Sequence, residues 1–261
     1  MEPPLLEVRD LRRSFGGLQA VRDVSFRLSR GLIKAVIGPN GAGKTTLFNL
    51  IAGTIPPHGG EVFFRGRAIT ARKPHVIAAL GIARTFQTTR LFAHMTVAEN
   101  VMVGRHPRTR CGFLACMLGL PRTWREEKET RTKALAILDG LGLGAYASET
   151  ASSLPFGRQR LVEFARALAT EPELLLLDEP AAGLNVHETR QLGELILRIR
   201  GRGVTCLIVE HDMSLVMDIS DEVVVLDQGS KIAEGTPHAI QRDPEVIRIY
   251  LGEDHAADPE S

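Results

Sequence analysis

One stretch of the sequence has the residue types and spacing of a loop that binds phosphate groups. It fits the pattern G-x-x-x-x-G-K-[ST] and consists of Gly38, Pro39, Asn40, Gly41, Ala42, Gly43, Lys44, Thr45 and Thr46. Glycines let backbone N–H groups approach the phosphates, because a Cβ would hold the oxygen atoms away. Lys44 can then reach the β- and γ-phosphates, and the Thr45 hydroxyl can bind Mg²⁺. The stretch therefore predicts a site for a nucleoside triphosphate.

The residues on either side predict the elements that position this loop. The apolar run at 33–37 predicts a buried strand entering it, and residues 46–52 predict a helix that leaves it and stops at Gly53. The dipole of that helix adds positive potential where the phosphates would lie. A fortuitous glycine turn would lack this strand–loop–helix context, so nucleotide binding is the favoured interpretation.

Two carboxylates follow a second apolar run. The four leucines at 174–177 predict a strand buried on both faces, as in a parallel sheet, and Asp178 and Glu179 come directly after them. Open α/β sheets bind ligands at this carboxyl edge, where carboxylates are costly without a cation. Asp178 is therefore a candidate Mg²⁺ ligand and Glu179 a candidate for polarising the attacking water; the alternative is a surface turn.

Three further residues occupy positions from which they can reach phosphate. His211 follows a predicted buried strand at 205–209, where it can contact the γ-phosphate or serve a structural role. Gln87 ends a strand predicted at 81–87 and can bind Mg²⁺ or orient water, although most glutamines are solvated surface residues. Gly157 stands at the start of a helix predicted over 158–169, which makes that helix N-terminus a second candidate anion site.

Length and composition restrict the class of protein. The chain has 261 residues, with 32 basic and 31 acidic side chains, so bulk charge does not indicate binding to nucleic acid or an anionic membrane. Cys111, Cys116 and Cys206 match no zinc or redox spacing and suit a reducing cytosol. The N-terminus lacks signal-peptide features, and the most apolar window is about half the length of a membrane span. We expect a cytosolic protein that only a partner would hold at a membrane.

The other segments predict two accessory parts. Short alternating strands near the N-terminus predict a small antiparallel sheet, and Phe15, in a turn between two of them, can stack on adenine or be a core aromatic. Residues 88–154 predict a helical insert, with a capping box at Thr96 and Glu99 and a long charged helix at 122–141. Its apolar loop at 111–120 either contacts a partner or packs on its own helices.

Taken in order, these motifs resemble those of ATP-binding cassette (ABC) ATPases over about residues 5–252. Within that family the chain most resembles the ATP-binding subunit of branched-chain amino-acid importers, on stretches at 15–18, 179–185, 209–213 and, at the end, 233–237 with 247–252. Lipopolysaccharide-export ATPases are also similar. The resemblance implies an α/β P-loop NTPase core (1–87 and 155–252) with a flanking antiparallel β subdomain, an inserted α-helical subdomain (88–154) and a disordered tail (253–261).

The resemblance also implies a role for each candidate residue. Phe15 stacks on adenine, the loop at 38–46 binds the triphosphate of ATP, and Gln87 senses Mg²⁺ and couples to the membrane subunit. Residues 154–158 form the signature motif, which faces the nucleotide of the other monomer. Asp178 is the Walker B acid, Glu179 the catalytic base and His211 the γ-phosphate switch.

Two motifs depart from the family pattern. The signature is usually Leu-Ser-Gly-Gly-Gln, but here it is Leu-Pro-Phe-Gly-Arg, so the serine hydroxyl is missing while Gly157 remains. Arg158 either compensates with its charge or is solvated. Asn185 replaces the aspartate that usually ends the loop after Walker B, which puts coupling through that carboxylate in doubt.

The resemblance implies ATP hydrolysis by a head-to-tail dimer of ABC ATPase subunits on the cytoplasmic face of the plasma membrane. The other implied partners are permease subunits and, indirectly, a substrate-binding receptor, and the cargo is a branched-chain amino acid. A non-transport ABC ATPase that acts on a soluble partner is the alternative from another class. A P-loop kinase has less support, because no second substrate lid is evident and Glu179 beside Asp178 suits water as the acceptor.

Overall fold

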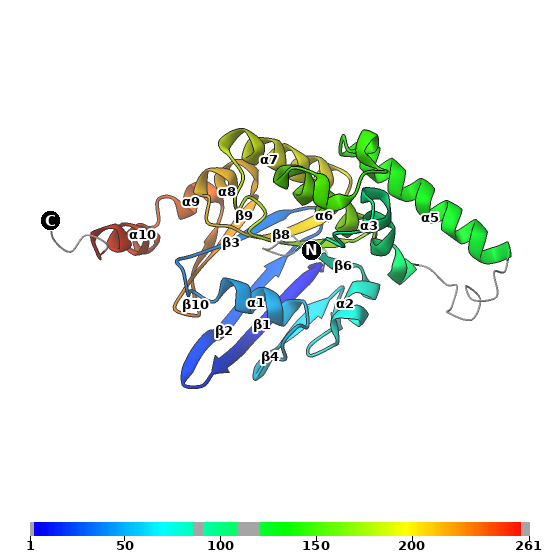
Figure 1. Ribbon diagram of the computed structural model, residues 1–261. Coiled ribbons are helices and arrows are strands. Elements are labelled where there is room, and N and C mark those ends of the chain that lie inside the picture. The colour runs from blue at the N-terminus through cyan, green and yellow to red at the C-terminus, as the bar shows by residue number, and fades with distance from the viewer. Residues whose placement is uncertain (1–2, 86–90, 109–120, 257–261) are drawn as a thin grey trace. The chain divides into compact units, whose positions relative to one another are not determined.

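The computed structural model describes residues 3–85, 91–108 and 121–256 (Figure 1). The chain divides into two compact units. The first unit comprises Met1–Ile77 and Leu176–Ser261, and the second comprises Ala78–Leu175. The subdomain boundaries at 88 and 154 stay a prediction from the family pattern.

An antiparallel sheet in the first unit has the strand order β2-β1-β4-β5. Its strands are β1 (Leu6–Phe15), β2 (Leu18–Leu28), β4 (Gly59–Phe64) and β5 (Arg67–Ala68). Buried Leu6 and Val8 alternate with less buried neighbours along β1, so one face of the sheet contributes to the core. β1 and β2 pair as a hairpin that turns at Gly16 and Gly17. This sheet confirms the predicted flanking β subdomain.

The larger sheet of the first unit has the order β10-β9-β3-β8-β7. Its strands are β3 (Ile33–Ile37), β7 (Leu174–Asp178, which starts in the second unit), β8 (Thr205–Val209), β9 (Glu222–Asp227) and β10 (Ser230–Gly235). β3 is parallel to β8 and β9, and β10 returns antiparallel to β9 after the Gln228-Gly229 turn. Every residue of β3, β7 and β8 is buried, as in a parallel sheet covered on both faces.

Helices follow the strands of the first unit. They are α1 (Lys44–Ile51), α7 (Val186–Gly201), α8 (Met213–Ile219), α9 (Pro237–Ile240) and α10 (Pro244–Ala256), while α2 (Pro74–Leu80) spans the boundary. Residues 253–256, assigned to a disordered tail from the sequence, are the last residues of α10, and 257–261 lie outside the described residues. No helix in the described ranges is both long and apolar enough to cross a membrane.

The second unit is mainly helical. Its elements are β6 (Ile82–Arg84), α3 (Val97–Gly104), α5 (Pro121–Gly140), α6 (Phe156–Leu168) and the short 3₁₀ turns η1 (His106–Arg108), η2 (Gly144–Tyr146) and η3 (Ala151–Ser153). Val101, Leu138 and Val162 belong to one apolar core formed by α3, α5 and α6. Thr96 and Glu99 form the predicted capping box at α3. The loop at 111–120, a candidate partner surface, lies outside the described residues.

Candidate functional site

The glycine-rich loop connects β3 to α1 in the first unit, as the sequence predicts. α1 begins at Lys44, two residues earlier than expected, and Gly43 is its N-cap. Gly38, Gly41 and Gly43 have φ values of 148°, 83° and 97°, which L side chains rarely adopt. The loop thus turns directly into a helix N-terminus, where unpaired N–H groups and the helix dipole favour an anion.

Two of these glycines also lie against other strands. A Cβ on Gly43 would be 2.2 Å from the Ala20 carbonyl oxygen of β2, and a Cβ on Gly38 would be 2.1 Å from the Leu226 oxygen of β9. Gly229, in the turn between β9 and β10, also contacts the loop, since its N–H donates to the Ala42 oxygen at 3.1 Å. The loop therefore owes its shape to both sheets of the first unit.

The Lys44 side chain is folded over the loop and is 7% exposed. Its Nζ donates hydrogen bonds to the carbonyl oxygens of Gly38 at 2.5 Å and Pro39 at 2.8 Å. A buried ammonium needs such acceptors, and these bonds place the positive charge at the loop. The charge is therefore held where a phosphate bound by the loop would be neutralised.

The carboxyl ends of three neighbouring strands lie side by side next to this loop. The Glu210 N–H, just after β8, donates to the Val36 oxygen of β3 at 3.4 Å. The Glu179 N–H, just after β7, donates to the Val209 oxygen of β8 at 2.9 Å. Asp178, Glu179 and His211 therefore belong to one edge of the sheet, in agreement with the rule for ligand sites in open α/β sheets.

The environments of these three side chains differ. Asp178 is buried at 2% exposure, Glu179 is partly exposed, and the His211 side chain is 63% exposed. Glu179 has a φ of 45°, a conformation that costs free energy for a residue with a Cβ and that occurs often at functional sites. The backbone thus turns sharply at the predicted catalytic carboxylate.

Sequence reasoning missed Glu210, which is fully buried at this edge. Its Oε1 accepts from the Ala181 N–H at 2.7 Å, and its Oε2 accepts from the N–H groups of His211 at 3.0 Å and Asp212 at 3.4 Å. Burial raises the pKa of the carboxyl, and these three hydrogen bonds partly oppose that effect. The sequence did hold a signal for this residue, because Glu210 stands directly between an apolar strand and the histidine predicted to be the switch.

The donor types of Thr45 and Asp178 suit Mg²⁺. The described residues contain no cluster of three or more His, Cys, Asp or Glu side chains that could hold a metal ion. Thr45 and Asp178 supply a hydroxyl and a carboxylate, and Mg²⁺ typically takes one or two such ligands and completes its shell with phosphate and water. Gln87, the third predicted ligand, lies outside the described residues.

Phe15, predicted to stack on adenine, lies at the end of β1 and is 45% exposed. The Arg13 guanidinium lies over its ring, 4.8 Å from the ring centroid. Arg13 is itself fixed by donation to the Pro56 oxygen at 2.9 Å. The ring is thus an exposed aromatic at the end of a strand of the antiparallel sheet and not a core residue, which removes one of the two alternatives.

The signature residues 154–158 lie in the second unit. α6 begins at Phe156, with Pro155 as its N-cap, so Gly157 lies in the first turn and the helix starts two residues earlier than predicted. Phe156 is 48% exposed. The Arg158 guanidinium lies over the Tyr146 ring at 4.2 Å, so its side chain is stacked on an aromatic as well as exposed to solvent.

Asn185, the second departure from the family pattern, has a structural role. Its Oδ1 accepts from the Glu188 N–H at 3.0 Å, and Glu188 Oε2 accepts from the Asn185 N–H at 3.0 Å. This capping box starts α7. Asparagine and aspartate cap helices about equally well, so the substitution removes a charge and keeps the cap.

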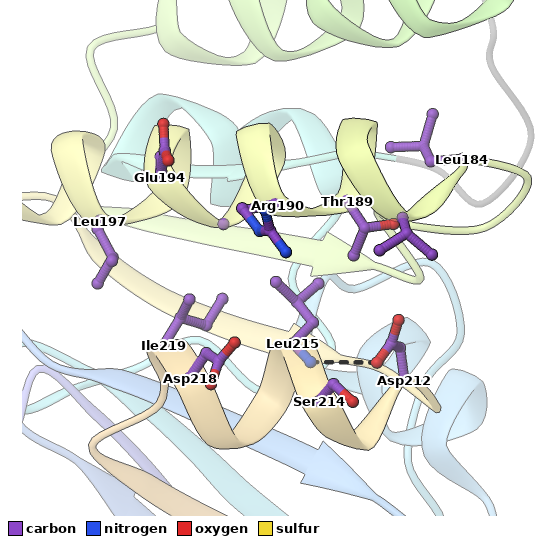
Figure 2. Close-up of a pocket in the computed structure, with 12 residues that line it drawn as sticks. Leu184, Thr189, Arg190, Glu194, Leu197, Asp212, Ser214, Leu215, Asp218 and Ile219 are labelled. Carbon is purple, nitrogen blue, oxygen red and sulfur yellow. Dashed lines mark hydrogen bonds between the residues drawn. The ribbon is translucent and has the colours of Figure 1, made fainter.

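A separate cavity of about 370 Å³ lies between α7 and α8. Figure 2 shows Leu215 and Ile219 of α8 directed toward α7, with Arg190 above them. The Asp212 carboxylate accepts from the Leu215 N–H at 3.1 Å and caps α8 (Figure 2). No residue of the phosphate loop lines this cavity, so it is distinct from the predicted triphosphate site.

Comparisons with known proteins agree with this geometry. A family model described as "ABC transporter" matches residues 21–182, and one described as "Branched-chain amino acid ATP-binding cassette transporter" matches residues 230–256. The chain is 46% identical over 254 residues to the high-affinity branched-chain amino acid transport ATP-binding protein LivG of Salmonella typhimurium, covering 97% of this chain and 100% of LivG. It is 45% identical to the corresponding protein BraF of Pseudomonas aeruginosa, with the same coverage.

The fold is also that of solved cassette structures. The ADP conformation of MJ1267, described as an ATP-binding cassette of an ABC transporter, superposes with a TM-score of 0.84 at 33% identity. The match covers 96% of this chain and 100% of that one. A nucleotide-free cassette from an ABC transporter superposes with a TM-score of 0.83 at 32% identity.

Proposed function

The chain belongs to the ABC transporter family, among its branched-chain amino-acid ATP-binding subunits, and from this premise we propose how its residues bind and hydrolyse ATP. The loop at 38–46 surrounds the triphosphate with N–H groups at the start of α1, and Lys44 supplies the positive charge. Phe15 stacks on the adenine ring. Asp178, Thr45 and Gln87 would hold Mg²⁺, and the bound ion would neutralise negative charge on the triphosphate.

Hydrolysis requires that water be aligned with the γ-phosphate, and we assign that role to Glu179. Its carboxylate comes from the sheet edge that also places His211, which contacts the γ-phosphate. Little covalent chemistry is left to the protein in phosphoryl transfer, so positioning and charge neutralisation supply most of the acceleration.

The second half of the site comes from another ATPase subunit, identical or related. Its signature residues 154–158 approach the bound ATP with the first turn of α6, where Gly157 exposes backbone N–H groups to the phosphate. The serine hydroxyl of the usual signature is missing, so this contact depends on the backbone. ATP thereby holds two subunits together, and hydrolysis releases them.

The dimer drives import of branched-chain amino acids through permease subunits at the cytoplasmic face of the plasma membrane. Coupling to the permease is assigned to Gln87, on the family pattern. A substrate-binding receptor delivers the amino acid on the other side. The observation that supports this cargo is 46% identity to LivG over its whole length.

Reconstitution tests the transport function. The chain is combined with the permease and receptor subunits of a branched-chain amino-acid importer, and ATP-dependent uptake of leucine, isoleucine and valine into vesicles is measured. We expect uptake with wild-type protein and none with Lys44→Ala. Uptake of a different solute class, or stimulation of ATPase activity only by a soluble protein, would contradict the importer function and leave the ATPase intact.

A further inference from the structure

Glu210 joins two segments that leave the sheet from different strands. One segment follows β7 and contains Glu179 and Ala181; the other follows β8 and contains His211 and Asp212. Glu210 Oε1 accepts from the first segment at Ala181, and Oε2 accepts from the second segment at His211 and Asp212. Beside the backbone bond from the Glu179 N–H to the Val209 oxygen, this carboxylate therefore links the backbone that bears the predicted base to the backbone that bears the predicted switch.

The surroundings of Glu210 suit a positioning role. The residue has 0% exposure, and a buried carboxylate is costly unless hydrogen bonds satisfy it. It accepts three backbone N–H groups, and the His211 ring lies nearby, with Nδ1 3.7 Å from Oε2. Since Asp212 also caps α8, the carboxylate connects the turn after Glu179 to the start of a helix.

We propose that Glu210 is a positioning residue for ATP hydrolysis, which holds the Glu179 segment and the His211 segment in one catalytic geometry. The proposal rests on the roles assigned above to Glu179 and His211. It explains why an acidic side chain occupies a buried position directly before a histidine that must be mobile enough to contact phosphate. Because Glu210 accepts these hydrogen bonds from backbone N–H groups of the two segments and not from the phosphate loop, its loss should affect turnover more than binding.

The near-isosteric substitution Glu210→Gln breaks the connection of residue 210 to one of the two segments and keeps the connection to the other. A carboxylate accepts at both oxygens, whereas a glutamine amide accepts at one and donates at the other. In either amide orientation one backbone segment meets an NH₂ group in place of an acceptor. The side chain keeps its size, but only one of the two segments keeps its hydrogen bonds to residue 210.

The experiment compares full-length wild-type protein with Glu210→Gln and with Glu210→Asp, which keeps both oxygens on a shorter side chain. Steady-state ATPase rates give kcat, and binding of ATP is measured separately in the Glu179→Gln background. We expect kcat to fall about 10- to 100-fold in both variants, in line with the effect of a misplaced catalytic group. ATP affinity should change by less than about threefold, because the phosphate loop is intact.

Glu234→Gln is the matched control for general destabilisation. Glu234, in β10, pairs with buried Lys34 at 2.6 Å, and Lys34 keeps a second partner in Glu222 at 2.9 Å. This variant also removes a carboxylate from a hydrogen-bonded site of the first unit, far from the loops in sequence. Its kcat should stay near that of the wild type even where its Tm falls as much as that of Glu210→Gln.

The outcomes distinguish the proposal from the function on which it rests. Normal kcat in Glu210→Gln and Glu210→Asp, with Glu179→Gln inactive, would overturn the positioning role alone. Normal kcat in Glu179→Gln would overturn the assignment of the base itself. A loss of ATP affinity as large as the loss of kcat in the Glu210 variants would show that the residue acts only through stability, and this too would overturn the proposal.

Discussion

The contact between the phosphate loop and β2 gives a prediction that separates two glycines of the same loop. Gly41 and Gly43 both have positive φ values, 83° and 97°. A Cβ on Gly41 has no described atom within 4 Å, whereas a Cβ on Gly43 would lie 2.2 Å from the Ala20 oxygen. Gly41→Ala therefore tests backbone strain alone, and Gly43→Ala tests the same strain together with a backbone clash.

The expected free-energy changes follow from these distances. A left-handed conformation costs an L residue roughly 1–2 kcal/mol, and this should be the whole effect of Gly41→Ala. Real Cβ atoms essentially never lie within 3.0 Å of such a neighbour, so Gly43→Ala must displace the loop or β2. We expect that displacement to add about 2 kcal/mol, which corresponds to a further drop in Tm of about 4–8 °C for a chain of this size.

Thermal unfolding without nucleotide measures this difference, because ATP would add its own stabilisation to each variant. Circular dichroism and calorimetry on the two purified variants, at equal protein concentration, are sufficient. Equal Tm values for Gly41→Ala and Gly43→Ala would refute the close approach of the loop to β2. A larger drop for Gly41→Ala would refute the reasoning from strain as well.

Three further predictions follow from single side chains. Lys44→Ala removes the charge held at the loop, so ATP affinity measured by calorimetric titration should fall at least about 100-fold, and tight binding would contradict the phosphate-loop assignment. Asn185→Ala should cost about 1 kcal/mol in urea unfolding, because the Glu188 N–H loses its cap, whereas Asn185→Asp should match the wild type. Burial raises the pKa of the Glu210 carboxyl in the folded protein above its value in the unfolded chain. The stability that this carboxyl contributes is therefore fully present below the unfolded-state pKa and is lost as the pH rises through the folded-state pKa. The stability advantage of wild type over Glu210→Gln should therefore shrink with rising pH, and a growing advantage would contradict this sign.

Much of the fold and the phosphate site could be predicted because their signals are local. Short, mostly apolar stretches located β3, β7 and β8, and the loop motif located the start of α1 within two residues. Periodicity is less informative at helix ends. α6 starts at Phe156, because Pro155 can cap a helix that it could not continue, and the sequence pattern placed that start two residues later.

Other features depend on contacts between segments that are distant in sequence. Nothing around Gly43 reveals that its Cβ position is occupied by Ala20, which lies in another sheet. The bond between Glu210 and Ala181 joins residues 29 positions apart, and a lone glutamate after a strand is usually a solvated residue. The stacking of Arg158 on Tyr146 is likewise a contact that residue type alone did not indicate.

The central claim is that this chain hydrolyses ATP in a dimer whose chemistry depends on Glu179. The most direct measurement is ATP turnover of Glu179→Gln, together with its mass in solution, in the presence of Mg²⁺ and ATP. The account predicts that the variant binds ATP, forms a dimer that persists and loses turnover by a factor of about 100 or more. Hydrolysis at the wild-type rate, or a monomer at saturating ATP, would contradict it.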